Sequence, residues 1–317
     1  MDCSNIRKAR SNVFLKMDHL APIVLFVYNR IDHLKQLITS LQLNEEAQYS
    51  DLHIYSDGPR DEAEVPEVEE VRCYLKSNTG FEKVEITHRD QNMGLAGNVI
   101  DGVSDVLKEN ETVIVLEDDL VLGGGFLKVM NELLVRYQQV KNIGSISGFV
   151  YPISIPQNAP DFFLLPRASS WGWATWSDRW VGVDWGISDF DEFVKSRKQQ
   201  ACFNQGGEDM TPMLMKWKFG INDSWAIRWS YHHFKNDMYG LFPKHNMVLN
   251  AGNDGSGTHS PTTEKYFNHL AIIDDFTFPE VPVIDRDLIR KLQWFFRLSV
   301  VRRVINKLIF MFESEKR

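Results

Sequence analysis

The sequence predicts an α/β protein built on a mainly parallel sheet, and three observations predict it. Short runs of β-branched and aliphatic residues alternate with segments of helical periodicity as far as residue 122. These runs are apolar throughout, as expected for strands that are buried on both faces of a parallel sheet. Polar and acidic residues directly follow the strands, and ligands of such sheets bind beyond the carboxyl ends of the strands. The sequence therefore predicts a doubly wound sheet with a ligand site along one edge.

The order of apolar runs and turn residues predicts each element in turn. The first strand, 21–28, ends in Asn29-Arg30, and a later strand, 51–56, ends in the turn Asp57-Gly58-Pro59. The other predicted elements are a helix at 34–41, a short strand at 84–87, a helix at 94–107, a strand at 112–116 and a glycine-broken strand at 143–149. Neither a GxGxxG motif nor a P-loop motif occurs, so a nucleotide on this sheet would be held in another way.

The strand at 112–116 leads into three acids, Glu117, Asp118 and Asp119. Three like charges at the end of a buried strand are unfavourable unless a cation neutralises them, and a divalent ion with oxygen ligands is suited to this. The alternative is a solvated junction between strand and loop. These residues alone leave both interpretations open.

Size, charge and cysteines limit the class of protein. The chain has 317 residues, 43% of them hydrophobic, which is enough for one extended α/β domain or two joined halves. Its net charge of −8 argues against a nucleic-acid-binding protein that works through a broad basic surface. The three cysteines are scattered without a CxxC pair, which predicts a reducing compartment, the cytoplasm. No membrane span is expected, because no uncharged apolar stretch reaches about 18 residues.

Tryptophans dominate the chain beyond residue 150. Eight of the nine lie between Trp171 and Trp229, most densely in the segment SWGWATW at 170–176. Tryptophan rings interleaved with Gly and Ser suit a wall that stacks on sugar rings, with Trp171 and Trp173 as candidates. The alternative is an aromatic core under a long loop. Further on, the glycine-rich segment 250–259 is long enough to act as a lid.

The joint order of the motifs, from about Pro22 to His259, resembles that of nucleotide-sugar glycosyltransferases with the GT-A fold. The motifs are a strand ending in Asn-Arg, a strand ending in Ser-Asp-Gly, a helix that starts with glycine, the strand leading into Glu-Asp-Asp, SWGWATW, an Asp-Ser-Trp segment and GNDGSGTH. The likeness is to family-two-type bacterial enzymes that build surface polysaccharides, and more distantly to the N-acetylglucosaminyltransferase of N-glycan branching. It implies a nucleotide-sugar-binding half at 20–150 and an acceptor-binding, catalytic half at 151–284.

The resemblance also implies a role for each matching residue. The expected donor contacts are Tyr28 and Asn29 to the base, Arg30 to the diphosphate, Asp57 to the base or ribose, and Asp118 to the ribose or sugar. Asp119 is expected to bind Mn²⁺ or Mg²⁺, and His259 to reach the metal or diphosphate as the lid closes. Arg30 also suits a diphosphate because a guanidinium can contact phosphate oxygens in pairs. For Asp57 the alternative is a turn carboxylate bonded to its own backbone.

A general base is required on the acceptor side of an inverting transferase. Asp223, in the segment 222–225, resembles the base of the distant relatives, although Ser224 replaces the second acid of their motif. The fallback is Glu208 or Asp209, because Gly-Glu-Asp resembles the base motif of processive polysaccharide synthases.

The sequence thus predicts a metal-dependent, inverting transfer of a sugar from a UDP-sugar to a carbohydrate acceptor, free or lipid-linked, in surface polysaccharide synthesis. Two alternatives are a catalytically silent carbohydrate-binding or scaffold protein and a metal-dependent nucleotidyltransferase. The intact Glu-Asp-Asp disfavours the first, and the second should not need an aromatic sugar wall.

The C-terminal segment 285–317 carries nine basic and four acidic residues, which leaves a net charge of −13 for the rest of the chain. An apolar stripe at helical spacing predicts one basic amphipathic helix, with stripe residues Trp294, Leu298, Val301, Ile305, Leu308 and Phe312. The helix would either pack on protein or lie peripherally on the inner face of an anionic membrane. Deletion of 286–317 is expected to leave the rest of the protein folded.

Overall fold

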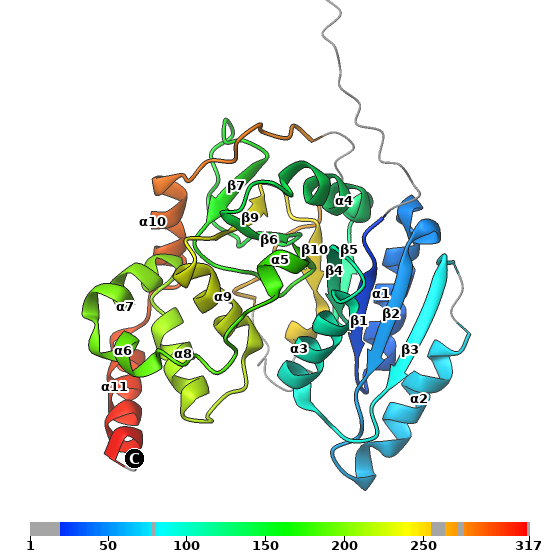
Figure 1. Ribbon diagram of the computed structural model, residues 1–317, viewed down its shortest axis with the longest axis horizontal. Helices are drawn as coiled ribbons and strands as arrows, with labels where there is room; N and C mark the ends of the chain where they lie inside the picture. Colours follow the sequence, from blue (N-terminus) through cyan, green and yellow to red (C-terminus); the bar gives the residue numbers. More distant parts are fainter. Residues whose placement is uncertain (1–19, 78–79, 255–263, 272–275, 316–317) are drawn as a thin grey trace, which may run out of the picture.

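The computed structural model describes residues 20–77, 80–254, 264–271 and 276–315. The strands of this part are β1 (Ile23–Val27), β2 (Asp51–Ser56), β3 (Lys83–His88), β4 (Thr112–Glu117), β5 (Leu120–Leu122), β6 (Ile143–Ser147), β7 (Phe162–Leu165), β8 (Trp173–Trp176), β9 (Tyr239–Pro243) and β10 (Val248–Asn250). Eight of these described strands form one sheet in the order β3-β2-β1-β4-β8-β6-β9-β7, and β10 pairs with β5 (Figure 1).

The sheet is mainly parallel, as predicted. Strands β3, β2, β1 and β4 are parallel to one another, and β8 runs antiparallel to both β4 and β6. Strand β9 is parallel to β6, so both run in the same direction as β4. The carboxyl ends of β1, β2, β4, β6 and β9 therefore all lie at one edge of the sheet.

Helices cover both faces of the sheet. The larger helices of the described chain are α1 (Ile31–Gln42), α2 (Val65–Leu75), α3 (Gly94–Val106), α4 (Phe126–Tyr137), α8 (Met210–Lys218), α9 (Trp225–Lys235), α10 (Arg286–Phe295) and α11 (Val300–Glu315). Residues of β1 alternate between the two cores: Ile23 and Leu25 join the core under α1 and α4, whereas Val24 and Phe26 join the core under α3 and α9. This burial on both faces explains why the strand sequences are apolar without alternation.

The predicted fold class is confirmed, and the strand at 51–56 and the helix that begins at Gly94 match the prediction closely. The sheet crosses residue 150, because β6 pairs with β8 and β9 from the later part of the chain. The boundaries at 150 and 284 therefore divide one continuous sheet, and they stay predictions.

A small helical layer follows β8, with its own apolar core. It follows the short helix α5 (Ser177–Trp180), whose Trp180 joins the core under α3, and it comprises α6 (Phe190–Lys195), α7 (Arg197–Phe203), α8 and the start of α9. Phe193, Phe203 and Tyr231 pack edge to face at its centre. In Figure 1 this layer lies beside α10 and α11, away from β1–β3.

The C-terminal segment differs from the prediction of one helix. Helix α10 ends at Phe295 and α11 begins at Val300, so the predicted stripe is interrupted after Trp294. The face of α10 that is buried carries Leu288, Ile289 and Leu292, whereas Trp294 is 75% exposed. Since α10 contributes these side chains to the main core, deletion of 286–317 should disturb the fold, which corrects the expectation from sequence.

Candidate active site

A pocket of about 270 Å³ lies at the carboxyl ends of β1, β2 and β4. Its lining includes seven of the predicted site residues: Tyr28, Asn29, Arg30, Asp57, Asp118, Asp119 and Trp171. The parallel register places the ends of the three strands side by side, which brings together Tyr28 and Asp119, 91 positions apart in the chain.

The three acids after β4 form the negatively charged end of this pocket. Asp118 is buried, and its carboxylate accepts a hydrogen bond from the Tyr28 amide at 3.2 Å. Burial raises the pKa of Asp118, repulsion from Asp119 adds to this, and Arg30 opposes it. Burial and the neighbouring Asp119 and Asp118 also raise the pKa of Glu117 well above its ordinary value. The solvated junction considered from sequence therefore does not describe Asp118, which is buried.

Arg30 supplies positive charge to the acidic end of the pocket. Its guanidinium forms an ion pair with Asp118 and another with Asp119, where Nη2 lies 3.1 Å from Oδ2. Burial alone would lower the pKa of Arg30, but its charge interactions with the two aspartates raise it. One guanidinium balances only one of its two carboxylate partners, so a cation bound beside Asp119 would be needed to neutralise both.

Asp119 is more accessible to a metal ion than Asp118. Its side chain is 13% exposed, Asn250 Nδ2 donates to its Oδ1 at 3.3 Å, and Ala251 N–H donates to its backbone oxygen at 2.7 Å. A Cβ on Gly252 would lie 2.4 Å from Asp119 Oδ2, so only glycine leaves the space beside this oxygen. Carboxylate and amide oxygens of this kind suit Mn²⁺ or Mg²⁺. No set of three or more acidic, histidine or cysteine side chains suitable for a metal occurs in the described ranges, and His259 lies outside them.

Asp57 and Tyr28 line the side of the pocket formed by β1 and β2. Asp57 is buried, and its Oδ1 accepts hydrogen bonds from Gly58 N–H at 2.9 Å and from Met93 N–H at 2.8 Å. Asp57 thus holds its own turn, as the alternative interpretation required, and also fixes the segment before α3. The Tyr28 hydroxyl donates to Glu64, which also pairs with Arg60. Arg60 lines the pocket but was not predicted, since nothing in its sequence context distinguishes it from a loop arginine.

The two candidate tryptophans have different surroundings. Trp171 is half-buried at the pocket and packs against Phe149, with ring centroids 4.5 Å apart. Trp173 is fully buried and packs against Trp225 and Trp180 at 5.1 and 5.6 Å. The prediction that Trp173 contacts the sugar is therefore corrected, because its ring has no exposed face. The aromatic-core alternative describes Trp173, and Trp171 keeps its predicted role as a candidate.

The candidate bases lie far apart. Asp223 is exposed and forms an ion pair with Arg228 at 3.3 Å. A Cβ on Gly94, which lines the pocket, would lie 3.9 Å from Asp223 Oδ2, so Asp223 lies at the pocket rim. Ser224 caps α9 by accepting a hydrogen bond from Ile227 N–H at 3.3 Å. Serine at this position therefore has a structural reason, since it begins the helix directly after Asp223.

Glu208 and Asp209 face the C-terminal helices instead. Glu208 accepts hydrogen bonds from Leu298 N–H at 3.0 Å and from Arg303 at 2.8 Å. Asp209 forms a two-pronged ion pair with Arg167, both distances being 2.9 Å. Neither acid lines the pocket beside β1, so of the two predicted base positions only Asp223 lies near the donor candidates.

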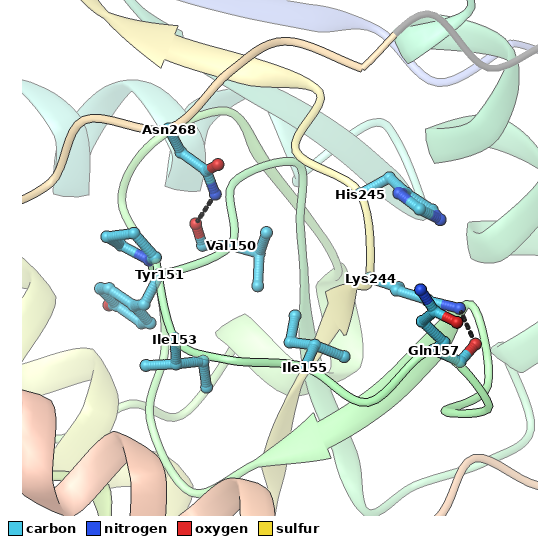
Figure 2. Close-up of a pocket in the computed structure, with 9 residues that line it drawn as sticks. Val150, Tyr151, Ile153, Ile155, Gln157, Lys244, His245 and Asn268 are labelled. Carbon is cyan, nitrogen blue, oxygen red and sulfur yellow. Dashed lines mark hydrogen bonds between the residues drawn. The ribbon is translucent and has the colours of Figure 1, made fainter.

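A second pocket, of about 380 Å³, lies at the same edge of the sheet, beyond β6 and β9 (Figure 2). Val150 and Tyr151 line it after β6, and Lys244 and His245 line it after β9. Three strand spacings separate β4 from β9, or about 14 Å. Phe149 packs against both Trp171 of the first pocket and Tyr151 of the second, so aromatic rings connect the two.

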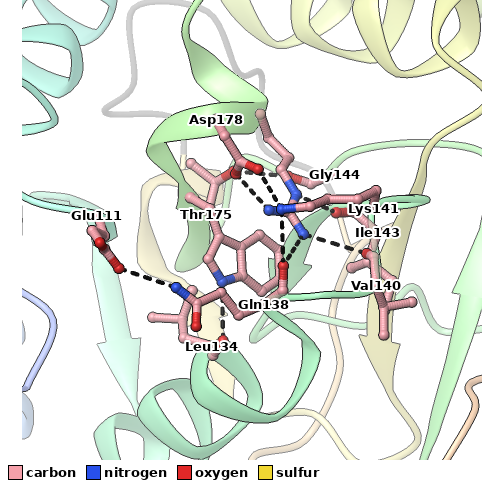
Figure 3. Close-up of polar contacts among 11 residues, drawn as sticks. Glu111, Leu134, Gln138, Val140, Lys141, Ile143, Gly144, Thr175 and Asp178 are labelled. Atoms are coloured by element: carbon pink, nitrogen blue, oxygen red, sulfur yellow. Dashed lines mark hydrogen bonds and ion pairs between the residues drawn. The ribbon is translucent and has the colours of Figure 1, made fainter.

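A further polar cluster, at the opposite edge of the sheet, is structural (Figure 3). Arg179 is 3% exposed and donates to the backbone oxygens of Gln138 at 2.7 Å and of Val140 and Ile143 at 3.4 Å. Its ion pair with Asp178 satisfies the remaining charge. Because the cluster satisfies its own polar groups, it ties β8 and α5 to the end of α4 and offers no ligand site.

The fold and the first pocket define an α/β protein with a polar ligand pocket beyond the ends of its parallel strands. The sequence model of the family described as Glycosyl transferase family 2 matches residues 23–163, from β1 into β7. This match supports the predicted class of enzyme, a nucleotide-sugar glycosyltransferase with the GT-A fold.

Other comparisons show more distant likeness. No curated protein matches the sequence significantly. Among solved structures, S. aureus TarS is 12% identical with a TM-score of 0.39, and the match covers 74% of this chain and 37% of the TarS chain. The mannosyltransferase PcManGT from Pyrobaculum calidifontis, in complex with GDP-Man and Mn²⁺, is 12% identical with a TM-score of 0.38, covering 69% of this chain and 71% of that one. These likenesses assign no role to individual residues here.

Proposed function

We propose that this glycosyltransferase moves a sugar, with inversion, from a UDP-sugar to a carbohydrate acceptor, free or lipid-linked, in surface polysaccharide synthesis. The observation that carries the proposal is the convergence of Arg30, Asp57 and the acids after β4 in one pocket. The UDP donor and the polysaccharide role are supported by the motif order that resembles family-two-type enzymes. The donor residues, the metal ligand and the base are part of the same proposal.

The donor is proposed to lie along the ends of β1, β2 and β4. Tyr28, Asn29 and Asp57 line the pocket at the ends of β1 and β2 and would contact the base and ribose. Arg30 would contact the diphosphate, because its guanidinium already lies between Asp118 and Asp119 and has N–H groups to spare for phosphate oxygens. Trp171 would pack on the transferred sugar.

Asp119 is proposed to hold Mn²⁺ or Mg²⁺, which when bound neutralises charge on the leaving diphosphate. The support is the oxygen donor set, the sharing of one guanidinium by two carboxylates and the space that Gly252 leaves beside Asp119. His259 stays a proposed contributor.

Asp223 is proposed as the general base. Its carboxylate would take the proton of the attacking hydroxyl while the acceptor oxygen bonds to the anomeric carbon. The bond from that carbon to the diphosphate oxygen breaks, and the nucleoside diphosphate leaves with the electron pair. The support for Asp223 over Glu208 is its place beside Gly94 at the pocket rim. The acceptor would extend towards the second pocket, where Lys244, His245 and Asn268 could bind hydroxyl groups.

The first test is a thermal-shift screen of UDP, UDP-sugars and GDP-mannose, with and without Mn²⁺. A UDP-sugar at 100 times its Kd should stabilise the native state by about 2.7 kcal/mol, and only with metal. The second test is UDP release, which should be inhibited by EDTA and lost in Asp119→Ala without loss of thermal stability. Turnover that is indifferent to EDTA would contradict the metal, and a response to GDP-mannose alone would contradict the UDP donor. A scaffold protein would release nothing, and a nucleotidyltransferase would release pyrophosphate from a nucleoside triphosphate.

A further inference from the structure

The outward face of α11 is apolar, which is the reverse of an ordinary surface helix. Six large apolar side chains of α11 are between 48% and 73% exposed: Val300, Val301, Val304, Ile305, Leu308 and Met311. With about 100° between successive residues, they lie within an arc of about 140°. Asn306, which is buried, points to the opposite side of the helix.

The polar contacts of α11 face the protein. Arg303 forms an ion pair with Glu208 at 2.8 Å, and the Phe310 ring lies 6.0 Å from that of Phe219. These contacts fix which side of α11 faces inward. The exposed apolar arc is therefore a consequence of how the helix is held, and not of a helix free to turn.

Basic residues border the apolar arc. Lys307 lies about 20° before its first edge and Arg302 about 60° beyond its second. Both are exposed. Trp294, 75% exposed at the end of α10, adds an aromatic side chain of the kind that favours a membrane–water interface.

We propose that this face, the apolar arc of α11 with Lys307 and Arg302 at its borders, binds the surface of an anionic lipid bilayer. No helix in the described part of the chain is long and apolar enough to cross a membrane, so α11 would lie along the surface. The charge argument favours lipid: segment 285–317 is basic in a chain that is otherwise acidic, whereas two copies meeting symmetrically through this face would bring their basic borders together. The proposal is independent of the donor, the metal and the base.

The test is flotation of the full chain with vesicles of phosphatidylcholine containing 30% phosphatidylglycerol, and with vesicles of phosphatidylcholine alone. We expect the wild type to float with the anionic vesicles and to remain largely unbound with the neutral ones. Val304→Asp combined with Leu308→Asp should weaken binding at least tenfold, because it places two charges within the arc. Arg302→Gln combined with Lys307→Gln should weaken binding to anionic vesicles about fivefold for each charge removed.

The matched control is Val135→Asp with Val181→Asp, two exposed valines on other elements, 56% and 70% exposed. It should float like the wild type, and all variants should keep the wild-type melting temperature and circular dichroism. A wild type that does not bind anionic vesicles would overturn the proposal. Unchanged flotation of the variant with Val304→Asp and Leu308→Asp would also overturn it. So would a wild type that does not float but forms a concentration-dependent dimer, if this variant abolishes the dimer.

Discussion

Gly252→Ala should disable the pocket by geometry alone, without changing its charge. The added Cβ would lie 2.4 Å from Asp119 Oδ2 and 3.0 Å from Arg30 Nη1. Restoring ordinary contact requires the carboxylate to move by about 1 Å, since the closely packed surroundings leave no room for a closer approach. A misplacement of about 1 Å in a catalytic constellation can cost about 100-fold in rate, which corresponds to about 2.7 kcal/mol. We therefore expect kcat/KM for UDP release to fall by about two orders of magnitude.

The assay is UDP release from the UDP-sugar found in the screen, measured over a range of Mn²⁺ concentrations. The apparent affinity for Mn²⁺ should weaken together with kcat/KM, because the same oxygen is displaced. Gly124→Ala is the control, since Gly124 is exposed and an added Cβ would meet nothing within 4 Å. If Gly252→Ala stays within threefold of the wild type, or if Gly124→Ala loses as much, the assignment of Asp119 as the metal ligand is wrong.

Three further predictions concern the base and the stability of the fold. Asp223→Asn should lower kcat by about 100-fold or more and leave the Kd of the UDP-sugar unchanged, whereas Glu208→Gln should keep kcat; the reverse result in steady-state kinetics would move the base to Glu208. Arg179→Met should lower the free energy of unfolding by about 3 kcal/mol, measured in urea, because it removes the hydrogen bonds of a buried guanidinium to three carbonyl oxygens and its ion pair with Asp178; a loss below about 1 kcal/mol would contradict this. His233 is buried and both its ring nitrogens lack a hydrogen-bond partner in the described chain, and burial lowers its pKa to about 3. The unfolded chain takes up this proton near pH 6.5, so stability should fall as the pH drops below 6.5, by about 2 kcal/mol at pH 5, and His233→Leu should remove that part of the loss; an unchanged pH dependence of the melting temperature would refute it.

Much of the fold and of the candidate site in residues 20–150 could be predicted from sequence. There the apolar runs of buried strands and the order of the motifs indicate the same elements. Strands buried on both faces are recorded as continuous apolar runs, and the parallel register then brings Arg30, Asp57 and Asp119 to one edge. The ion pairs within the candidate site could not be predicted from sequence. The pairing of Arg30 with the two aspartates depends on side-chain directions at a strand end, which periodicity does not specify.

Sequence periodicity also could not show which tryptophan lies at the pocket and which lies in the core. Trp171 and Trp173 are two residues apart with Gly172 between them, at a φ of 56°. This left-handed turn precedes β8, so Trp171 stays at the pocket while Trp173 enters the sheet and its core. A single backbone conformation therefore decides which ring is available to a ligand.

The two acids that were the fallback candidates for the base, Glu208 and Asp209, determine where α11 lies. Asp209 holds Arg167, whose guanidinium stacks 3.8 Å over the ring of Phe296, directly after α10. Glu208 accepts the amide of Leu298, in the turn between the helices. The Gly-Glu-Asp segment thus fixes the end of α10 and the start of α11 together. Because Phe296 also packs against Tyr151, whose ring lines the second pocket, the same contacts set the orientation of the proposed membrane face relative to the acceptor side of the sheet.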